Sequence, residues 1–287
     1  MSLLDKRLKA FFQIAQSGTV FGAAKTLGFT QTALTQRIRS LEEELQVTLF
    51  TRSRKGMRLT PEGIALLQYC KGAEELEGST FSRIVANDNS NETHLTIAAP
   101  TSAMSFHFVQ GGAGVMKTYP GLFVHMKIDD HVNRVDLVRT GQAQLAIVPP
   151  DQVPNEMDSK KLRSNNYVLV CSPAWKARKL DDILSSERII DFYESDKTTL
   201  NYLKKFGLES LVRRPRLYVN HNLAMIELLL AGIGFGTLTQ EIAKPYLESG
   251  QLLQLNRGKT LEEPMALVWY PRPQMPKYFK AVIQSTR

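Results

Sequence analysis

Cysteine and histidine are sparse in this sequence, and neither falls in a metal-binding pattern. The two cysteines, Cys70 and Cys171, stand far apart with no CxxC pair, and the five histidines are scattered. Neither residue type therefore has the spacing of a zinc site or of a disulfide framework. We expect no metal, a reducing compartment, and two cysteines that act as small buried hydrophobic side chains.

Motifs of enzyme active sites are also missing. No GxSxG elbow and no HExxH helix occurs, so nucleophilic and zinc-dependent hydrolysis have no basis in the sequence. Residues 232–236 (GIGFG) look like part of a dinucleotide fingerprint, but a predicted helix precedes them and a predicted strand follows, which reverses the required order. We predict that the protein is not an enzyme and needs no cofactor.

No apolar run is long enough for a membrane span. The best candidate, residues 223–238, is interrupted by Glu227 and by three glycines, whereas a spanning helix needs about 20 apolar residues. The N-terminus carries charges between Asp5 and Lys9, unlike a secretory leader. We therefore expect a cytoplasmic protein without a membrane partner.

Positive charge is in excess, and it is concentrated near the N-terminus. The formal net charge is +8. Residues 1–60 hold ten basic and four acidic side chains, whereas the rest of the chain holds 26 basic and 24 acidic ones. A localised excess of this kind indicates an anionic partner such as nucleic acid.

Residues 19–45 have the pattern of a helix-turn-helix. Thr19 can cap a short helix, Gly28 ends it, and Thr30 can cap a second helix with an apolar inner face. The outward positions of the second helix bear Gln, Thr and Arg, which pair with base edges or phosphates in a major groove. The structural alternative, an amphipathic helix with a solvated polar face, does not predict the basic hairpin that follows it.

Residues 50–59 (FTRSRKGMRL) predict that hairpin, with glycine at the turn and basic side chains on the rim. A basic hairpin beside a recognition helix is the wing of a winged helix, which contacts phosphates or the minor groove. The candidate contacts to double-stranded DNA are Thr30, Gln31, Thr32, Thr35, Gln36, Arg37, Arg39, Arg52, Arg54, Lys55 and Arg58.

A long helix is predicted to begin at Thr60-Pro61, a cap followed by proline. Its apolar positions keep a spacing of three and four residues, so one stripe needs a partner. The stripe consists of Leu66, Tyr69, Ala73, Leu76, Thr80 and Ile84. The alternative is that this helix packs onto its own chain. Polar residues 87–92 mark a hinge after it.

From residue 94 onward, short apolar runs alternate with helical segments, which indicates an α/β domain with a largely parallel sheet. We predict strands at 95–99, 122–128, 145–148, 167–170, 188–192, 217–219, 235–238, 252–255 and 266–269, and helices at 136–139, 199–206, 223–230 and 242–247.

Polar residues follow several of these strands, at the edge where open α/β sheets bind ligands. After the first strand, Thr101 and Ser102 offer hydroxyls and backbone N–H groups that could hold a carboxylate. The candidate effector contacts are Thr101, Ser102, Asp130, Pro149, Glu194, Asp196, Thr198 and Asn220. Any of the later ones could instead be a helix cap, as Asn220 could be for the helix 223–230.

Residues 1–63 resemble the DNA-binding domain of LysR-type transcriptional regulators. The matching positions are Phe11, Ser17-Gly18, Ala23-Ala24, Leu27, Gln31, Ala33-Leu34-Thr35, Ile38, Leu41-Glu42, Leu45, Leu49-Phe50, Arg52, Leu59-Thr60-Pro61 and Gly63. Thr30, Thr32 and Thr35 stand where Ser or Pro is commoner, which affects base preference rather than class. The rest of the chain resembles the effector domain of the same regulators.

The resemblance implies three parts. A winged helix-turn-helix (residues 1–60) is followed by a linker helix and hinge (61–91), and the linker helix pairs antiparallel with that of another protomer. The α/β effector-binding domain (92–287) has two lobes of the periplasmic-binding-protein kind. Lobe I spans about 92–163 and 266–287, lobe II spans about 164–265, and the crossovers lie near 163–166 and 263–265.

The resemblance also implies partners. These are promoter DNA, a small-molecule effector in a cleft lined by Thr101 and Ser102, a second protomer bound through the linker helix, a homotetramer, and RNA polymerase.

Four short motifs of the effector domain are similar to the ArgP/LysG branch of these regulators, whose members respond to lysine and arginine. The motifs are IDD (128–130), GQA (141–143), CSPAW (171–175) and ESGQL (248–252). A cationic amino acid needs a carboxylate-binding end and an anionic end in one cleft. Thr101 and Ser102 could supply the first, and Asp130, Glu194 or Asp196 the second. We predict a DNA-binding transcriptional regulator whose oligomer is switched by such an effector.

Two alternatives stay open at this point. One is an enzyme on an α/β scaffold with an accessory DNA-binding head, which would need a catalytic constellation that the sequence lacks. The other is an architectural DNA binder without a ligand, which predicts that no metabolite raises the thermal stability of the protein.

Overall fold

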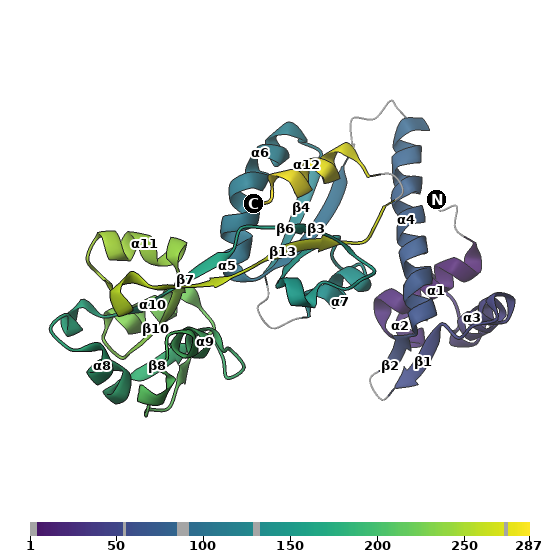
Figure 1. Ribbon diagram of the computed structural model, residues 1–287. Coiled ribbons are helices and arrows are strands. Elements are labelled where there is room, and N and C mark those ends of the chain that lie inside the picture. Colours follow the sequence, from purple (N-terminus) through teal and green to yellow (C-terminus); the bar gives the residue numbers. More distant parts are fainter. Residues whose placement is uncertain (1–4, 54–55, 85–91, 129–132, 273–274) are drawn as a thin grey trace.

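The computed structural model describes residues 5–53, 56–84, 92–128, 133–272 and 275–287, and of residues 52–53 and 75–84 it describes the backbone alone. The chain forms a small N-terminal helical domain with a hairpin, one long helix, and an elongated α/β domain with two lobes (Figure 1).

The N-terminal domain contains the predicted helix-turn-helix. Its helices are α1 (Lys6–Ser17), α2 (Val20–Leu27) and α3 (Gln31–Leu45). The Thr19 hydroxyl accepts a hydrogen bond from Gly22 N, and the Thr30 hydroxyl accepts one from Ala33 N at 3.1 Å, so both predicted caps are confirmed. Gly28 ends α2 in the left-handed conformation that glycine adopts most easily.

The predicted hairpin is present and is docked on the helices. It pairs β1 (Phe50–Ser53) with β2 (Gly56–Leu59). Met57 N donates to Gly18 O at 2.8 Å, which ties the hairpin to the turn between α1 and α2. Gly56 has φ +117°, and a Cβ there would lie 2.5 Å from Gly18 O, so this close approach requires glycine.

The long helix α4 (Pro61–Ile84) begins as predicted, with the Thr60 hydroxyl accepting from Gly63 N at 3.0 Å. Leu67 and Cys70 are buried in the N-terminal core, so the first turns of α4 pack onto their own chain. Tyr69, on the stripe that we assigned to a partner, is 62% exposed. The alternative of own-chain packing therefore holds for one face of α4 and leaves Tyr69 on another face uncovered.

Lobe I is built on a five-stranded sheet of order β4-β3-β5-β13-β6. Its strands are β3 (Thr93–Ala99), β4 (Leu122–Ile128), β5 (Leu145–Val148), β6 (Asp158–Lys161) and β13 (Ala266–Trp269). Its helices are α5 (Thr101–Ala103), which continues through the π-helical turn Met104–Val109 into α6 (Gln110–Thr118), then α7 (Arg134–Arg139) and α12 (Lys277–Ser285).

Lobe II has a second sheet of order β11-β7-β10-β8-β9, with β12 also paired to β7. Its strands are β7 (Asn165–Cys171), β8 (Arg188–Asp191), β9 (Leu217–Tyr218), β10 (Gly234–Thr239), β11 (Leu253–Gln254) and β12 (Thr260–Glu263). Its helices are α8 (Leu180–Ser186), α9 (Thr198–Lys205), α10 (Asn222–Leu230) and α11 (Gln240–Glu248).

Both sheets are mixed, with one strand in each running against all the others, so the predicted α/β domain is confirmed and its sheet is divided into two. β13 runs antiparallel to β5 and β6, and β7 runs antiparallel to β10, β11 and β12. The reason is topological. The chain leaves lobe I after β6, enters lobe II through β7 and returns to lobe I through β13. Each of these two entering strands, β7 and β13, runs opposite to the other strands of its sheet. The crossings lie at residues 162–164 and 264–265, within or beside the two predicted ranges.

Both cysteines are buried and unpaired. Burial raises the pKa of the Cys70 thiol to about 11 and that of Cys171 to about 12, so both stay protonated and act as hydrophobic side chains. Among the described residues, no helix has the length and apolar character to cross a membrane, and no three metal-ligating side chains cluster.

Candidate functional site

The outer face of α3 carries the candidate DNA contacts. Gln31, Thr32, Gln36 and Arg39 are exposed, while Thr35 is partly buried and donates its hydroxyl to Gln31 O at 2.8 Å. The Thr30 hydroxyl is engaged in the helix cap. The face therefore offers amide and guanidinium groups to a partner, as major-groove reading requires.

A groove of about 300 Å³ separates α3 from the hairpin. Gln31 and Thr35 line it from α3, and Gly56 and Met57 line it from β2. Arg58 is exposed on β2 but is not one of the lining residues of the groove. Arg54 and Lys55 lie outside the described residues, as does the side chain of Arg52.

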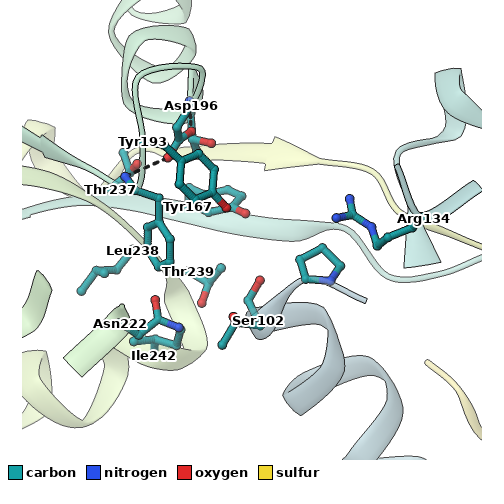
Figure 2. A pocket seen from close by; sticks show the side chains of 14 residues that line it. Ser102, Arg134, Tyr167, Tyr193, Asp196, Asn222, Thr237, Leu238, Thr239 and Ile242 are labelled. Atoms are coloured by element: carbon teal, nitrogen blue, oxygen red, sulfur yellow. Dashed lines mark hydrogen bonds between the residues drawn. The ribbon is translucent and has the colours of Figure 1, made fainter. Parts of the chain in front are cut away.

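A second cavity, of about 150 Å³, lies between the two lobes (Figure 2). Its lining residues are Pro100, Thr101, Ser102, Arg134, Tyr167, Phe192, Tyr193, Asp196, Thr198, Asn222, Thr237, Leu238, Thr239 and Ile242. Four of the eight candidate effector contacts, Thr101, Ser102, Asp196 and Thr198, therefore meet at one place although nearly a hundred residues separate the two pairs in the chain.

Three other candidates do not line the cavity, and Asp130 lies outside the described residues. Pro149 follows β5, as expected, but does not line the cavity. Arg134 lines it instead and donates to Ile147 O in β5 at 2.9 Å. The Glu194 side chain is exposed, and its carbonyl accepts from Arg216. Asn220 is neither a lining residue nor the cap.

The cap of α10 is His221, whose ring accepts from Ala224 N at 3.3 Å. This shifts the start of the helix to Asn222, which lines the cavity in place of Asn220.

Helix N-termini converge on the cavity. Thr101, Thr198 and Asn222 are the first residues of α5, α9 and α10, and Thr239 directly precedes α11. Backbone N–H groups at helix N-termini attract anions. Thr198 N already donates to the Asp196 carboxylate, so α9 does not offer its first N–H group to a ligand. The other helix starts favour a carboxylate in the cavity.

Negative charge collects at the lobe II wall. The Asp196 carboxylate accepts from Thr198 N, the first residue of α9, at 2.9 Å, although the N-cap position is Lys197, and Asp196 also lines the cavity. Burial, and next the charge of Asp196, raise the pKa of the Glu263 carboxyl. Burial also raises the pKa of Tyr167, and the Glu263 charge adds to the rise. Two acids and a phenol thus stand close together, an arrangement that favours a cation.

A buried ion pair fixes this wall. Arg216 binds Asp191 at 3.0 Å and donates to Glu194 O and Asp196 O, both at 2.7 Å. Asp191 is almost fully buried, and burial raises the pKa of its carboxyl. Arg216 therefore fixes the backbone of the segment that carries Tyr193 and Asp196.

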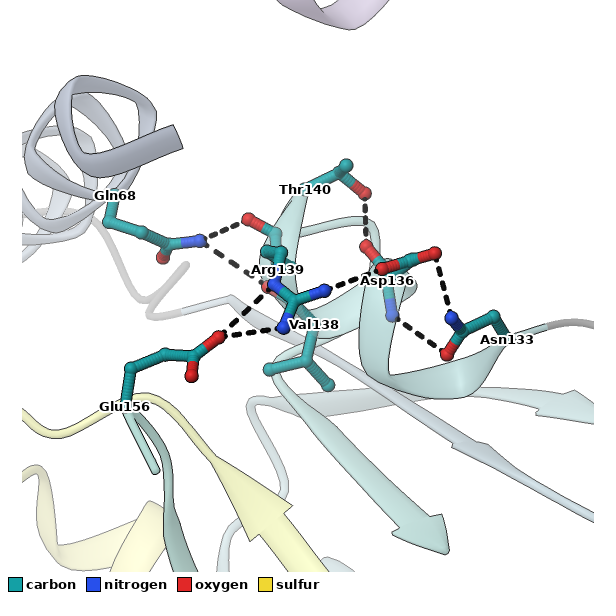
Figure 3. Close-up of polar contacts among 7 residues, drawn as sticks. All are labelled: Gln68, Asn133, Asp136, Val138, Arg139, Thr140 and Glu156. Atoms are coloured by element: carbon teal, nitrogen blue, oxygen red, sulfur yellow. Dashed lines mark hydrogen bonds and ion pairs between the residues drawn. The ribbon is translucent and has the colours of Figure 1, made fainter. Parts of the chain in front are cut away.

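Helix α7 has one end at the cavity and the other end against α4, and Figure 3 shows the contact with Gln68 of α4. At its N-terminal end Arg134 lines the cavity. At its C-terminal end Gln68 of α4 donates to the carbonyls of Val138 and Arg139, and Lys71 donates to Thr140 O at 2.6 Å. Polar groups of α4 thus satisfy carbonyls that the end of a helix leaves open.

Sequence reasoning missed polar and apolar lining residues alike: Arg134, Tyr167, Phe192, Tyr193, Asn222, Thr237, Leu238, Thr239 and Ile242. Arg134, Tyr193 and Asn222 stand at or near helix starts, and Thr237 lies inside a buried strand. The signal available for Thr237 was a hydroxyl at an inward position of the run 234–239 (GFGTLT). No local pattern marks Tyr167, since its place depends on where the chain crosses between lobes.

Two protein-family models match the chain. Residues 6–64 match the bacterial regulatory helix-turn-helix protein of the lysR family, and residues 88–287 match the LysR substrate binding domain. Together they cover nearly all of the sequence, so the N-terminal domain and the two-lobed domain fall within one known architecture.

Full-length relatives support the same assignment. The transcriptional regulator PtxR of Pseudomonas aeruginosa is 27% identical over 293 aligned positions, which cover 98% of this chain and 91% of PtxR. The regulator ArgP of Aeromonas salmonicida is 27% identical and covers 94% of this chain and 91% of its own length.

Solved structures share the fold. ArgP from Mycobacterium tuberculosis superposes with a TM-score of 0.80 at 21% identity, covering 99% of this chain and 96% of that one. Full-length LysG from Corynebacterium glutamicum with bound effector Arg gives a TM-score of 0.79 at 19% identity, covering 98% and 95%. The chain belongs to the LysR family of DNA-binding transcriptional regulators, which are not enzymes.

Proposed function

We propose that a small cationic amino acid, such as lysine or arginine, binds between the lobes and switches the oligomer on DNA. The observation that carries this proposal is the polarity of the cavity. Hydroxyls and helix N-termini at Thr101, Ser102, Thr198 and Asn222 suit a carboxylate, and Asp196 with the nearby Glu263 suits a cation. The names of the ArgP relatives and the arginine bound to LysG point in the same direction.

Contact with α4 gives the effector a route to the DNA-binding domain. Arg134 lies at one end of α7, a helix of six residues, and the carbonyls bound by Gln68 and Lys71 lie at the other end. Closure of the lobes around Arg134 would therefore move α7 and change its contact with α4. In the proposed dimer the exposed face of α4 around Tyr69 packs against another protomer, so a shift of α4 changes the spacing of two recognition helices.

Calorimetry with matched ligands tests this function. We expect arginine or lysine to bind, and citrulline, which has the shape of arginine without the cation, to bind about tenfold more weakly because a charge-assisted hydrogen bond is lost. Asp196→Asn keeps an oxygen that can accept from Thr198 N and should reduce the difference between arginine and citrulline. Asp181→Asn, on the exposed start of α8, is the matched control and should change neither affinity.

Equal binding of arginine and citrulline would contradict a cationic effector. Absence of any ligand effect on calorimetry or thermal stability, across amino acids and organic acids, would favour the ligand-independent architectural DNA binder.

A further inference from the structure

The turn between α2 and α3 presents an aromatic side chain to solvent. Phe29 is 42% exposed, although its backbone is held in place by a hydrogen bond from its N–H to Ala24 O at 3.1 Å. It lies between the left-handed Gly28 and the helix cap Thr30, so it has a fixed position at the N-terminal end of α3.

Arg37 covers that ring. The guanidinium carbon lies 4.0 Å from the centre of the Phe29 ring, which is the geometry of a cation–π contact. Arg37 follows Phe29 by about two turns of helix, so its side chain extends back toward the N-terminal end of α3, the end that enters the groove in a helix-turn-helix. Among the described residues no carboxylate forms an ion pair with Arg37. Its charge is therefore held in place and left available to an anion.

The position of Arg37 around α3 shows which part of DNA it can reach. Gln31 and Thr35 face the hairpin, because both line the groove together with Gly56 and Met57. At about 100° per residue, Arg37 lies about 200° around the helix from Thr35. It is therefore on the flank away from the hairpin, beside the face that carries Gln36 and Arg39, and not at the centre of that face.

We propose that Phe29 and Arg37 together form a phosphate-binding pair on the flank of α3 opposite the hairpin. Arg37 contacts the DNA backbone rather than a base edge, and Phe29 is a positioning residue that holds the guanidinium before DNA arrives. The hairpin and the Phe29–Arg37 pair then contact the DNA backbone on opposite sides of the recognition helix α3. The sequence predicted only that Arg37 contacts DNA, and this assignment gives it the backbone rather than a base edge as its target.

Binding measurements on the full-length protein separate the two roles. The probes are a duplex selected by the protein from a randomised pool and a scrambled duplex of the same composition. Arg37→Ala should weaken binding to both duplexes by a similar factor, about tenfold, and reduce the salt slope by about one unit. Phe29→Leu should weaken both about threefold with the slope unchanged, because the charge remains.

A double-mutant cycle shows whether Phe29 acts through Arg37. In the Arg37→Ala background, Phe29→Leu should have no further effect. In the native background, Phe29→Trp keeps an aromatic face and should bind both duplexes as tightly as the native protein. Thermal unfolding of each variant controls for loss of fold. The proposal is overturned if Arg37→Ala changes base preference in the selected site and leaves the affinity for scrambled DNA unaltered. It is equally overturned if Phe29→Leu costs the same with and without Arg37.

Discussion

Arg216 is the side chain outside the cavity whose loss should damage the cavity most. Asp191, its partner at 3.0 Å, is 1% exposed, and Arg216 itself is 18% exposed. Arg216→Ala leaves a buried carboxylate without its cation, a change that costs about 3–5 kcal/mol in buried pairs. Because part of Arg216 reaches solvent, we take the lower end, about 3 kcal/mol.

That magnitude is measurable by calorimetric unfolding. In a domain of this size, 1 kcal/mol shifts the midpoint by about 2–4 °C, so the variant should unfold about 6–12 °C lower than the native protein. Arg213→Ala, a neighbouring exposed arginine, is the matched control and should stay within about 0.5 kcal/mol of the native stability. Arginine binding should weaken with the loss of Arg216, because the Asp196 and Glu194 carbonyls lose their donor.

The dependence of the loss on pH identifies its cause. Burial raises the pKa of Asp191, and removal of Arg216 should raise it further. A carboxyl whose folded pKa lies above its unfolded value contributes most to stability at low pH, and the contribution is lost as the pH rises through the folded pKa. The loss of stability in Arg216→Ala should therefore be smaller at about pH 5 than at about pH 7.

Adding Asp191→Asn to that variant should recover most of the stability. A deficit that does not change with pH, or a double variant no more stable than Arg216→Ala, would refute the reasoning.

Three further predictions concern the cavity, α4 and the hairpin. Glu263→Gln should raise the midpoint of unfolding at neutral pH, because burial raises the pKa of this carboxyl and its charged form is costly, and should weaken arginine binding about tenfold in calorimetry; a stable variant that binds arginine normally would exclude a role for its charge. Gln68→Ala combined with Lys71→Met should leave arginine affinity intact and reduce the effect of arginine on DNA affinity, a coupling of about 1–3 kcal/mol in known systems; unchanged coupling would remove α7 from the route. Gly56→Ala should displace the hairpin, because the added Cβ would meet Gly18 O at 2.5 Å, and should weaken DNA binding in anisotropy titrations to about a tenth; native affinity would show that the hairpin does not touch DNA.

The local parts of the fold could be predicted because their signals are local. Thr19 and Thr30 cap helices and Gly28 ends one, each through groups within four residues in the chain. The predicted strand 122–128 is present with the same bounds in the structure. β12 was missed because Thr260–Glu263 is polar and short, and it is a strand only through its pairing with β7.

The cavity was predictable only in part. Asp196 could be named because it follows a strand. Its carboxylate also accepts from Thr198 N at the start of α9. Only the neighbouring Tyr167 and Glu263 distinguish a ligand contact from this local hydrogen bond. Tyr167 and Arg134 come from different lobes, and their meeting depends on the long-range crossings of the chain. Sequence spacing contains no information on such a meeting.

In the proposed mechanism, a ligand between the lobes adjusts which spacing of DNA sites the oligomer prefers. The most direct measurement is the ratio of affinities for two duplexes that carry the same half-sites one helical turn closer or farther apart, with and without saturating arginine. We expect arginine to change this ratio by a factor of about five or more, and the arginine affinities of the two protein–DNA complexes to differ by the same factor. An unchanged ratio, in a protein shown by calorimetry to have arginine bound, would contradict it.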